Sequence, residues 1–198
     1  MLSKASESLT NRLVTNNIIK MEDYEIYQFG IENFMMKAGH IVSYIIIGLL
    51  FQLLPELLVF LTVFIPLREN AGGYHAKTPL KCYILSCCTV LTLLCIICFI
   101  TESMMEFSIV LAVVSSLVLF LIAPVDTENK PLDEAELTYY KSKAGFIIII
   151  ELGLVLIFRM LLWNELSFIV ALSLTYELLI VLAGILVKVS ESGYKHVE

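Results

Sequence analysis

Long apolar stretches alternate with short polar segments along most of the chain. Five apolar blocks are visible, at 41–66, 82–100, 107–125, 145–162 and 167–189. A helix needs about 20 residues, within a range of about 17–25, to cross the hydrocarbon core of a bilayer. Each of the last four blocks therefore predicts one transmembrane helix. The first block contains Pro55, and it predicts either one tilted helix or two short segments that meet near that proline.

The N-terminal arm, residues 1–39, has a different pattern, because apolar and charged side chains are interleaved along it. Its apolar residues include Leu9, Leu13, Ile18, Ile19, Ile26, Phe29, Phe34 and Met35. This pattern is typical of helices that lie in the membrane interface with one apolar face toward the lipid. It fits a contact between two subunits equally well, so a homodimer is an open alternative.

The composition also indicates a membrane protein. Of 198 residues, 59% are hydrophobic and 16% are charged, against about 45–50% and about 25% in soluble domains. We expect a single all-α domain over residues 1–198, a polytopic bundle of about four full transmembrane helices with a Pro-bent or re-entrant first segment and the amphipathic arm. The formal net charge of -6, without a clustered basic face, argues against a nucleic-acid partner.

Positive charges predict which loops face the cytoplasm, because Lys and Arg concentrate in cytoplasmic loops. The loops at 67–81 and 126–144 each carry three of them, whereas the connector at 101–106 carries none. Placing both loops and the C-terminus inside lets the last four helices alternate correctly. The arm also carries Lys and Arg, so we favour a hairpin bent at Pro55 that returns the chain to the cytoplasm. The alternative is a single crossing with an external arm.

The polar segment that carries the candidate chemistry runs from Pro66 to Cys82 and reads PLRENAGGYHAKTPLKC. Thr78 is a residue type that caps helix N-termini, and proline, here Pro79, is favoured at the first helical position. Cys82 would then be the fourth residue of a long apolar helix. The positive end of the helix dipole and the adjacent Lys81 both favour the thiolate, which is the nucleophilic form of a cysteine.

His75 lies seven residues before Cys82. In one straight helix the two residues would be about 10.5 Å apart, whereas proton transfer requires about 2.6–3.2 Å or one bridging water. Gly72 and Gly73 permit positive φ angles, and Pro79 interrupts a helix, so a bent loop can close the gap. The spacing is therefore compatible with a Cys–His pair for covalent catalysis only if the loop folds back.

The other four cysteines, Cys87, Cys88, Cys95 and Cys98, follow within one apolar 17-residue window that starts at Cys82. They are interpreted as small apolar residues of a membrane helix. A zinc site would need ligands in paired spacings with histidine, and this window offers none. We expect no metal and no other cofactor.

The segment around His75 resembles the signature of the accessory gene regulator B (AgrB) family. The resemblance rests on Arg68, Gly72-Gly73-Tyr74-His75-Ala76, Thr78 and Cys82. A second stretch, Ala123-Pro124-Val125-Asp126-Thr127-Glu128-Asn129-Lys130-Pro131-Leu132, is similar to the family's other recognisable loop and follows the third apolar block. The number of blocks, the polar arm and the chain length also agree, so the resemblance covers essentially the whole chain.

The resemblance implies a membrane cysteine endopeptidase of bacterial quorum sensing. Such an enzyme removes the C-terminal tail of an autoinducing-peptide precursor and helps to form a cyclic thiolactone or lactone. Cys82 would be the nucleophile and His75 the general base, in a loop that faces the cytoplasm of a bacterial cell. Gly72, Gly73 and Arg68 would support the site, the glycines through the bend and Arg68 by pairing with a propeptide carboxylate.

Three charged residues, Glu151, Arg159 and Glu177, lie within or near apolar blocks. Charges at membrane depth are costly, so such residues commonly serve a function. Arg159 is close enough to a helix end to reach the interface. Glu177, near the middle of its block, is expected to face the bundle interior, where it would support the site, contact a partner subunit or pair with another helix.

No third catalytic residue can be assigned from the sequence. Glu69 and Asp126 are loop candidates for orienting His75, although each is better described as a solvated loop charge. His40 and His196 are interpreted as structural or solvated. Two other functions stay open: a non-enzymatic peptide exporter or channel, which would leave the loop chemistry without a role, and a structural scaffold.

Overall fold

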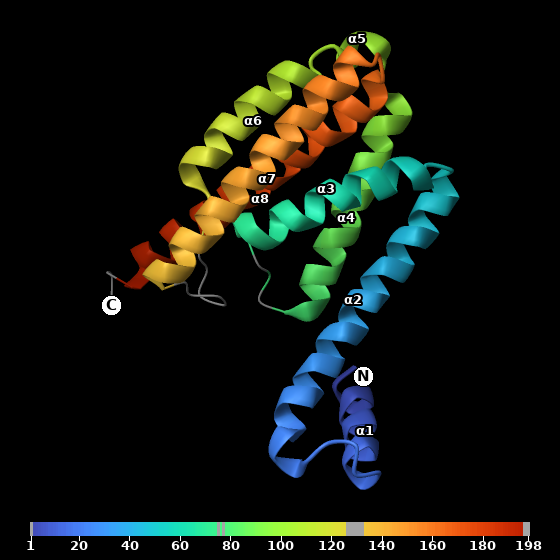
Figure 1. The fold of residues 1–198 in the computed structure, drawn as a ribbon, viewed down its shortest axis with the longest axis vertical. Coiled ribbons are helices and arrows are strands. Elements are labelled where there is room, and N and C mark those ends of the chain that lie inside the picture. The colour runs from blue at the N-terminus through green and yellow to red at the C-terminus, as the bar shows by residue number, and fades with distance from the viewer. Residues whose placement is uncertain (1, 75, 77, 126–132, 196–198) are drawn as a thin grey trace.

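The computed structural model describes residues 2–74, 76, 78–125 and 133–195, and it is a helical bundle from which an N-terminal arm projects (Figure 1). The predicted all-α fold class is confirmed. In chain order the elements are α1 (Leu2–Thr15), the 3-10 turn η1 (Met21–Asp23), α2 (Tyr24–Phe51), α3 (Leu54–Ala71), α4 (Pro79–Phe99), α5 (Glu102–Met105), α6 (Ser108–Ile122), α7 (Glu134–Met160) and α8 (Asn164–Lys195).

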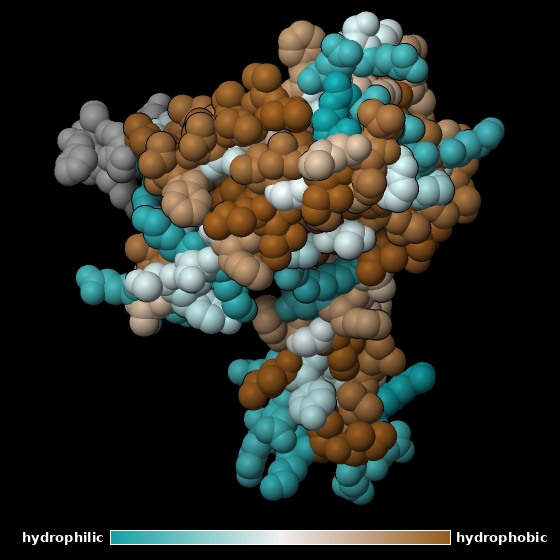
Figure 2. Space-filling model, turned by 45° about the horizontal axis from the view of Figure 1, so that its top comes forward, coloured by the Kyte–Doolittle hydropathy of each residue, from teal (hydrophilic) through white to brown (hydrophobic). Residues whose placement is uncertain are grey.

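Four stretches of the described chain are helical, long and apolar enough to cross a membrane: Met21–Phe51, Pro79–Phe99, Glu102–Ile122 and Asn164–Ser190. They establish a polytopic membrane protein. The predicted block at 145–162 is helical as far as Met160, where α7 ends. The sequence pattern predicts a transmembrane helix there, but the block is not among these four stretches, because α7 carries charged residues at 143, 151 and 159. On the face drawn in Figure 2, apolar side chains cover most of the bundle, whereas apolar and hydrophilic side chains alternate on the arm.

The first apolar block forms parts of two helices, as one of the two alternatives predicted. α2 ends at Phe51, Gln52 takes a left-handed conformation with φ 57°, and α3 begins with Pro55 in its first turn. Proline is tolerated there because the first N–H groups of a helix have no acceptor within it. α2 is longer than expected, since it continues from Tyr24 through residues 39–41 without a break. At 28 residues it extends over about 42 Å.

α8 is the central helix of the bundle. It packs against α3, α6 and α7, and it contributes Leu174 to one apolar core cluster and Ile169 to another. Short polar contacts join the same helices: the hydroxyl of Ser173 donates to Glu151 Oε2 of α7 at 3.0 Å, and Ser167 Oγ lies 3.2 Å from Ser108 Oγ of α6. Small and hydroxyl-bearing residues let membrane helices approach closely and hydrogen-bond, so α8 is held firmly beside α6 and α7.

Candidate functional site

The start of α4 places Cys82 where the sequence predicts it. Thr78 has an extended conformation, its side-chain oxygen accepts from the N–H of Lys81 at 3.4 Å, and Pro79 is the first helical residue. The N–H of Cys82 then donates to the carbonyl of Thr78 at 3.1 Å. The predicted cap is confirmed, and Cys82 is half-buried in the first turn of a 21-residue apolar helix.

A cleft of about 400 Å³ lies between α2, α3 and α4, and Cys82 forms part of its wall. Aromatic and aliphatic side chains such as Phe60 and Phe64 make most of that wall. Its polar members include Lys37, His40, Tyr44, Arg68, Glu69 and Ser86. Binding sites for small molecules and peptides are commonly apolar clefts with a few polar groups that fix orientation, so this cleft is the candidate site.

The two glycines after α3 adopt the positive φ angles that the sequence predicts, +73° at Gly72 and +99° at Gly73. The backbone on both sides of Gly72 pairs with Val125, which belongs to the second stretch that resembles the family. The N–H of Val125 donates to Ala71 O at 3.0 Å, and the N–H of Gly73 donates to Val125 O at 3.2 Å. A Cβ on Gly72 would lie 2.3 Å from Val125 O, so no other residue fits there without a shift of the backbone.

The same segment rests directly on α8. The N–H of Tyr74 donates to Ile180 O at 3.0 Å, and a Cβ on Gly73 would lie 2.9 Å from that oxygen. On the helix side, a Cβ on Gly184 would lie 2.7 Å from the nitrogen of Tyr74. Glycines on both surfaces therefore allow the loop backbone to touch the helix backbone.

Arg68 closes this arrangement from α3. Its guanidinium donates to the carbonyl of Gly72 and, at 2.6 Å, to that of Tyr74. Its Nη1 also lies 3.6 Å from Oε1 of Glu177, which is fully buried in α8. As predicted, Glu177 faces the bundle interior. A buried carboxylate needs an opposite charge, and Arg68 supplies it while it holds both sides of the double-glycine turn.

The remaining predicted site residues are distributed as follows. His75, Asp126 and His196 lie outside the described residues. Glu69, a candidate for orienting His75, pairs with Lys37 of α2 at 3.6 Å, and both side chains are mostly exposed. Among the cysteines beyond Cys82, three are exposed on α4 and Cys87 is half-buried. Within the described part of the chain, no three His, Cys, Asp or Glu side chains gather as metal ligands.

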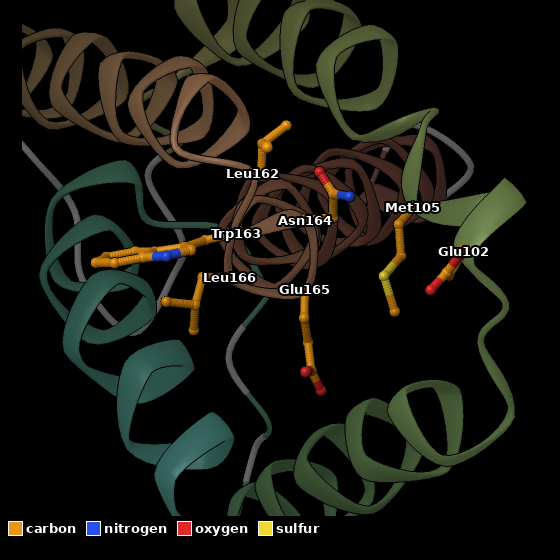
Figure 3. Close-up of a pocket in the computed structure, with 7 residues that line it drawn as sticks. All are labelled: Glu102, Met105, Leu162, Trp163, Asn164, Glu165 and Leu166. Atoms are coloured by element: carbon orange, nitrogen blue, oxygen red, sulfur yellow. The ribbon is translucent and has the colours of Figure 1, made fainter.

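A second cavity of about 560 Å³ lies at the opposite end of α4. Figure 3 shows Glu102 and Met105 of α5 on one side of it, and Asn164 and Glu165 at the start of α8 on the other. The 20 positions from Cys82 to Glu102 correspond to about 30 Å along the helical direction. None of the residues matched to the family signature lines this cavity, so we assign the candidate site to the smaller cleft.

Several residues of this region have no clear signal in the sequence. Gly184 carries only the weak signal of a glycine within an apolar helix, and Val125 contributes through its backbone, which has no sequence signature. The sequence indicates a structural or solvated role for His40, yet this residue lines the cleft that contains Cys82. Its position on α2, far from Cys82 in sequence, hides this proximity.

Comparison with known proteins identifies the family. The chain matches the family described as Accessory gene regulator B over residues 6–187. It is 30% identical over 166 residues to an AgrB-like protein of Clostridium perfringens (strain SM101 / Type A), with 78% of this chain and 74% of that protein covered. An AgrB-like protein 2 of Clostridium perfringens (strain 13 / Type A) is 29% identical over 163 residues, with the same 78% and 74%.

An AgrB-like protein of Clostridium acetobutylicum is 30% identical over 144 residues, with 69% of this chain and 65% of that protein covered. No solved structure matches the chain. The family match extends from the arm almost to the end of α8 and includes Arg68, the two glycines of the turn and Cys82. The chain therefore belongs to the accessory gene regulator B family.

Proposed function

We propose that this protein is a membrane cysteine endopeptidase that cuts the C-terminal tail from a short autoinducing-peptide precursor and promotes closure of the remaining peptide into a thiolactone or lactone. Membership of the AgrB family supports a role in peptide processing within the accessory gene regulator system. The observation that carries the proposal is the position of Cys82, on the first turn of a capped helix and on the wall of an apolar cleft.

His75 is the proposed general base. Its sequence neighbours Tyr74 and Ala76 both line the cleft that Cys82 lines. Tyr74 is fixed to α8 by a backbone hydrogen bond, and Thr78 caps α4. Only three residues connect these two anchors, and this short connection supports the proposed pairing of His75 with Cys82.

In the proposed cleavage step, His75 takes the proton of the Cys82 thiol, and the resulting thiolate attacks the carbonyl carbon of the scissile peptide bond. Backbone N–H groups at the start of α4 are the natural donors to the oxyanion that forms. The carbon–nitrogen bond then breaks, and His75 gives the leaving amine its proton. The tail departs, and the rest of the precursor stays on Cys82 as an acyl-enzyme thioester.

In the proposed ring-closing step, a thiol within the precursor attacks that thioester while its proton passes to His75. The Cys82 thiolate leaves and is regenerated. One thioester replaces another, so the step is nearly balanced in energy and needs no ATP. Hydrolysis would compete with closure, and the apolar wall of the cleft would help to keep water from the acyl group.

Four residues are proposed as supporting rather than reacting groups: Arg68, Gly72, Gly73 and Glu177. The Arg68–Glu177 ion pair and the two carbonyls that Arg68 binds fix the chain directly before His75. The glycines allow that chain to pass between Val125 and α8. Their proposed contribution is the position of the general base, which matters because a displacement of about 1 Å can cost about 100-fold in rate.

We further infer that the catalytic loop faces the cytoplasm, where a newly made precursor would reach it. Lys and Arg in the segments 67–81 and 126–144, which include the adjoining ends of α3, α4 and α7, support that orientation. The exposed apolar side chains of the arm, among them Ile26, Phe29 and Phe34, are consistent with either lipid contact or a homodimer.

The experiment that tests the function is cleavage of a synthetic cognate autoinducing-peptide precursor by the purified protein in liposomes. Wild type is compared with Cys82→Ala and His75→Ala, and Cys88→Ala, which changes an exposed cysteine of the same helix, is the matched control. Release of the tail by wild type and Cys88→Ala alone supports the proposal. Cleavage by Cys82→Ala at the wild-type rate contradicts it. Transport of an uncut precursor would favour an exporter instead.

A further inference from the structure

His40 has one ring nitrogen whose role the fold does not explain. Its Nδ1 lies 2.9 Å from the carbonyl oxygen of Met36, one turn earlier on α2. A carbonyl only accepts, so Nδ1 carries the hydrogen, and in the neutral ring Nε2 presents a lone pair. That Nε2 atom is buried and has no hydrogen-bond partner among the described residues.

The ring of His40 is held in place between two tyrosines. Its centroid lies 5.9 Å from that of Tyr44 and 5.2 Å from that of Tyr83, the residue after Cys82. The hydroxyl of Ser43 donates to its own helix, so the hydroxyl of Tyr83, 2.5 Å away, donates to Ser43. This bond joins α2 to α4 beside the candidate nucleophile and holds the Tyr83 ring next to the imidazole.

The surroundings offer His40 no charged partner of its own among the residues that the structure describes. Lys37, one turn before it on α2, pairs with Glu69 of α3. Arg68, another cation of the cleft wall, is engaged by Glu177 and by two backbone carbonyls. A buried acceptor without a donor costs free energy, and in a cleft that carries a nucleophile the missing donor is expected to come from the ligand.

We propose that His40 is a precursor-binding residue: when the precursor enters the cleft beside Cys82, the side chains that cover Nε2 move apart, and Nε2 accepts a hydrogen bond from a donor group of the peptide. The inference rests on the proposed function, since it takes the precursor as the ligand. It goes beyond that function by adding α2 to the peptide-binding surface. The donor is a backbone N–H or a polar side chain of the precursor, and the experiment below separates the two.

The test measures binding without cleavage. The Cys82→Ala protein in lipid nanodiscs is titrated with the fluorescently labelled precursor, and Kd is read from anisotropy. His40→Phe, made in this background, keeps an aromatic ring between the two tyrosines but removes the acceptor, and it is expected to raise Kd about tenfold. His40→Gln restores an acceptor near Nε2 and should bring Kd back to within about threefold. His196→Phe, beyond the family match that ends at residue 187, is the matched control.

Each outcome is decisive. An unchanged Kd in His40→Phe overturns the proposal, and so does an equal loss in His40→Phe and His40→Gln, because packing alone would explain it. Failure of the Cys82→Ala protein to bind the precursor overturns it as well. If the precursor binds as expected but wild type does not cut it, the peptidase proposal fails and the assignment of His40 stands.

The donor is found on the peptide side. Single ester linkages replace one backbone N–H at a time, and each polar side chain is separately replaced by alanine. The change that weakens binding to the Cys82→Ala protein about tenfold, yet has little further effect when His40 is Phe, marks the donor. If every change is additive with His40→Phe, the contact does not exist. In protein that retains Cys82, His40→Phe should raise KM for precursor cleavage about tenfold and leave kcat within about twofold of the value without this substitution.

Discussion

Nη1 of Arg68 lies 3.6 Å from Oε1 of Glu177, and this pair connects the proposed catalytic loop to the central helix of the bundle. The same guanidinium binds the carbonyls of Gly72 and Tyr74. The buried carboxylate of Glu177 therefore helps to position, through Arg68, the backbone from Gly72 to Tyr74 that directly precedes His75. The apparent cost of burying Glu177 has a structural reason, because its carboxylate holds the cation that organises the turn.

Replacement of Glu177 by glutamine should lower the rate of precursor cleavage about tenfold, because Arg68 loses the charge that fixes it. Glu151→Gln is the matched control: Glu151 is also a buried carboxylate, but it accepts a hydrogen bond from Ser173 instead of pairing with Arg68. Its cleavage rate should stay within about threefold of wild type. Initial rates in proteoliposomes measure both, and equal losses in the two variants would contradict the role given to Glu177.

Gly184→Ala should lower cleavage at least tenfold without unfolding the protein. The added Cβ would lie 2.7 Å from the backbone nitrogen of Tyr74, so the loop must move away from α8. A Cβ on Gly153 of α7 would point into open space, and alanine there should be neutral or raise stability by about 0.5–1 kcal/mol. Cleavage rate and Tm are measured for both variants. A fully active Gly184→Ala protein would show that the close approach is dispensable.

Thr78→Ala removes the side-chain cap of α4. The bond to the N–H of Lys81 is long at 3.4 Å, so the loss of stability should lie at the low end for N-caps, about 0.5 kcal/mol. The rate of alkylation of Cys82 by iodoacetamide should change several-fold, since the first turn that positions this thiol frays. Thr78→Ser retains the oxygen and should behave as wild type. Peptide mapping by mass spectrometry follows the reaction, and identical rates in all three proteins would exclude a role for the cap.

The orientation of the bundle can be tested with a thiol reagent that does not cross membranes. In a protein whose only cysteine is Cys82, labelling should occur in inside-out vesicles and not in right-side-out vesicles. A protein whose only cysteine is introduced by Glu165→Cys, at the second cavity, should show the opposite pattern, because the two positions lie at opposite ends of the bundle. Labelling of both from one side would contradict the proposed topology.

Much of this arrangement follows from local sequence signals. Thr78 and Pro79 predict the start of α4, because capping depends on residues that are adjacent in the chain. Gly72 and Gly73 predict positive φ angles, because a φ angle is a property of a single residue and glycine adopts positive values readily. The break predicted near Pro55 in the first apolar block is present between α2 and α3. The prediction that Glu177 faces the bundle interior is also correct.

The parts that the sequence does not reveal are contacts between distant segments. Val125 contacts the double-glycine turn through its backbone, and Gly184 allows the turn to approach α8 because it has no side chain. Neither contact produces a recognisable sequence pattern. α2 is longer than the sequence pattern indicates, because its polar residues before His40 resemble those of a separate surface helix. That continuity brings His40 to the cleft, and it explains why a histidine without any local signal lies near Cys82.

The central claim is that Cys82 forms a covalent acyl-enzyme. The test uses a precursor whose ring-forming cysteine is replaced by alanine, so that ring closure cannot discharge the thioester. This precursor is mixed with the wild-type protein, the reaction is quenched with acid, and the mass of the protein is measured by mass spectrometry. We predict a hydroxylamine-sensitive gain in mass equal to the precursor without its tail. This gain should map to Cys82, be absent from Cys82→Ala and be sharply reduced in His75→Ala. Release of the tail by Cys82→Ala, or an adduct on another residue, would contradict it.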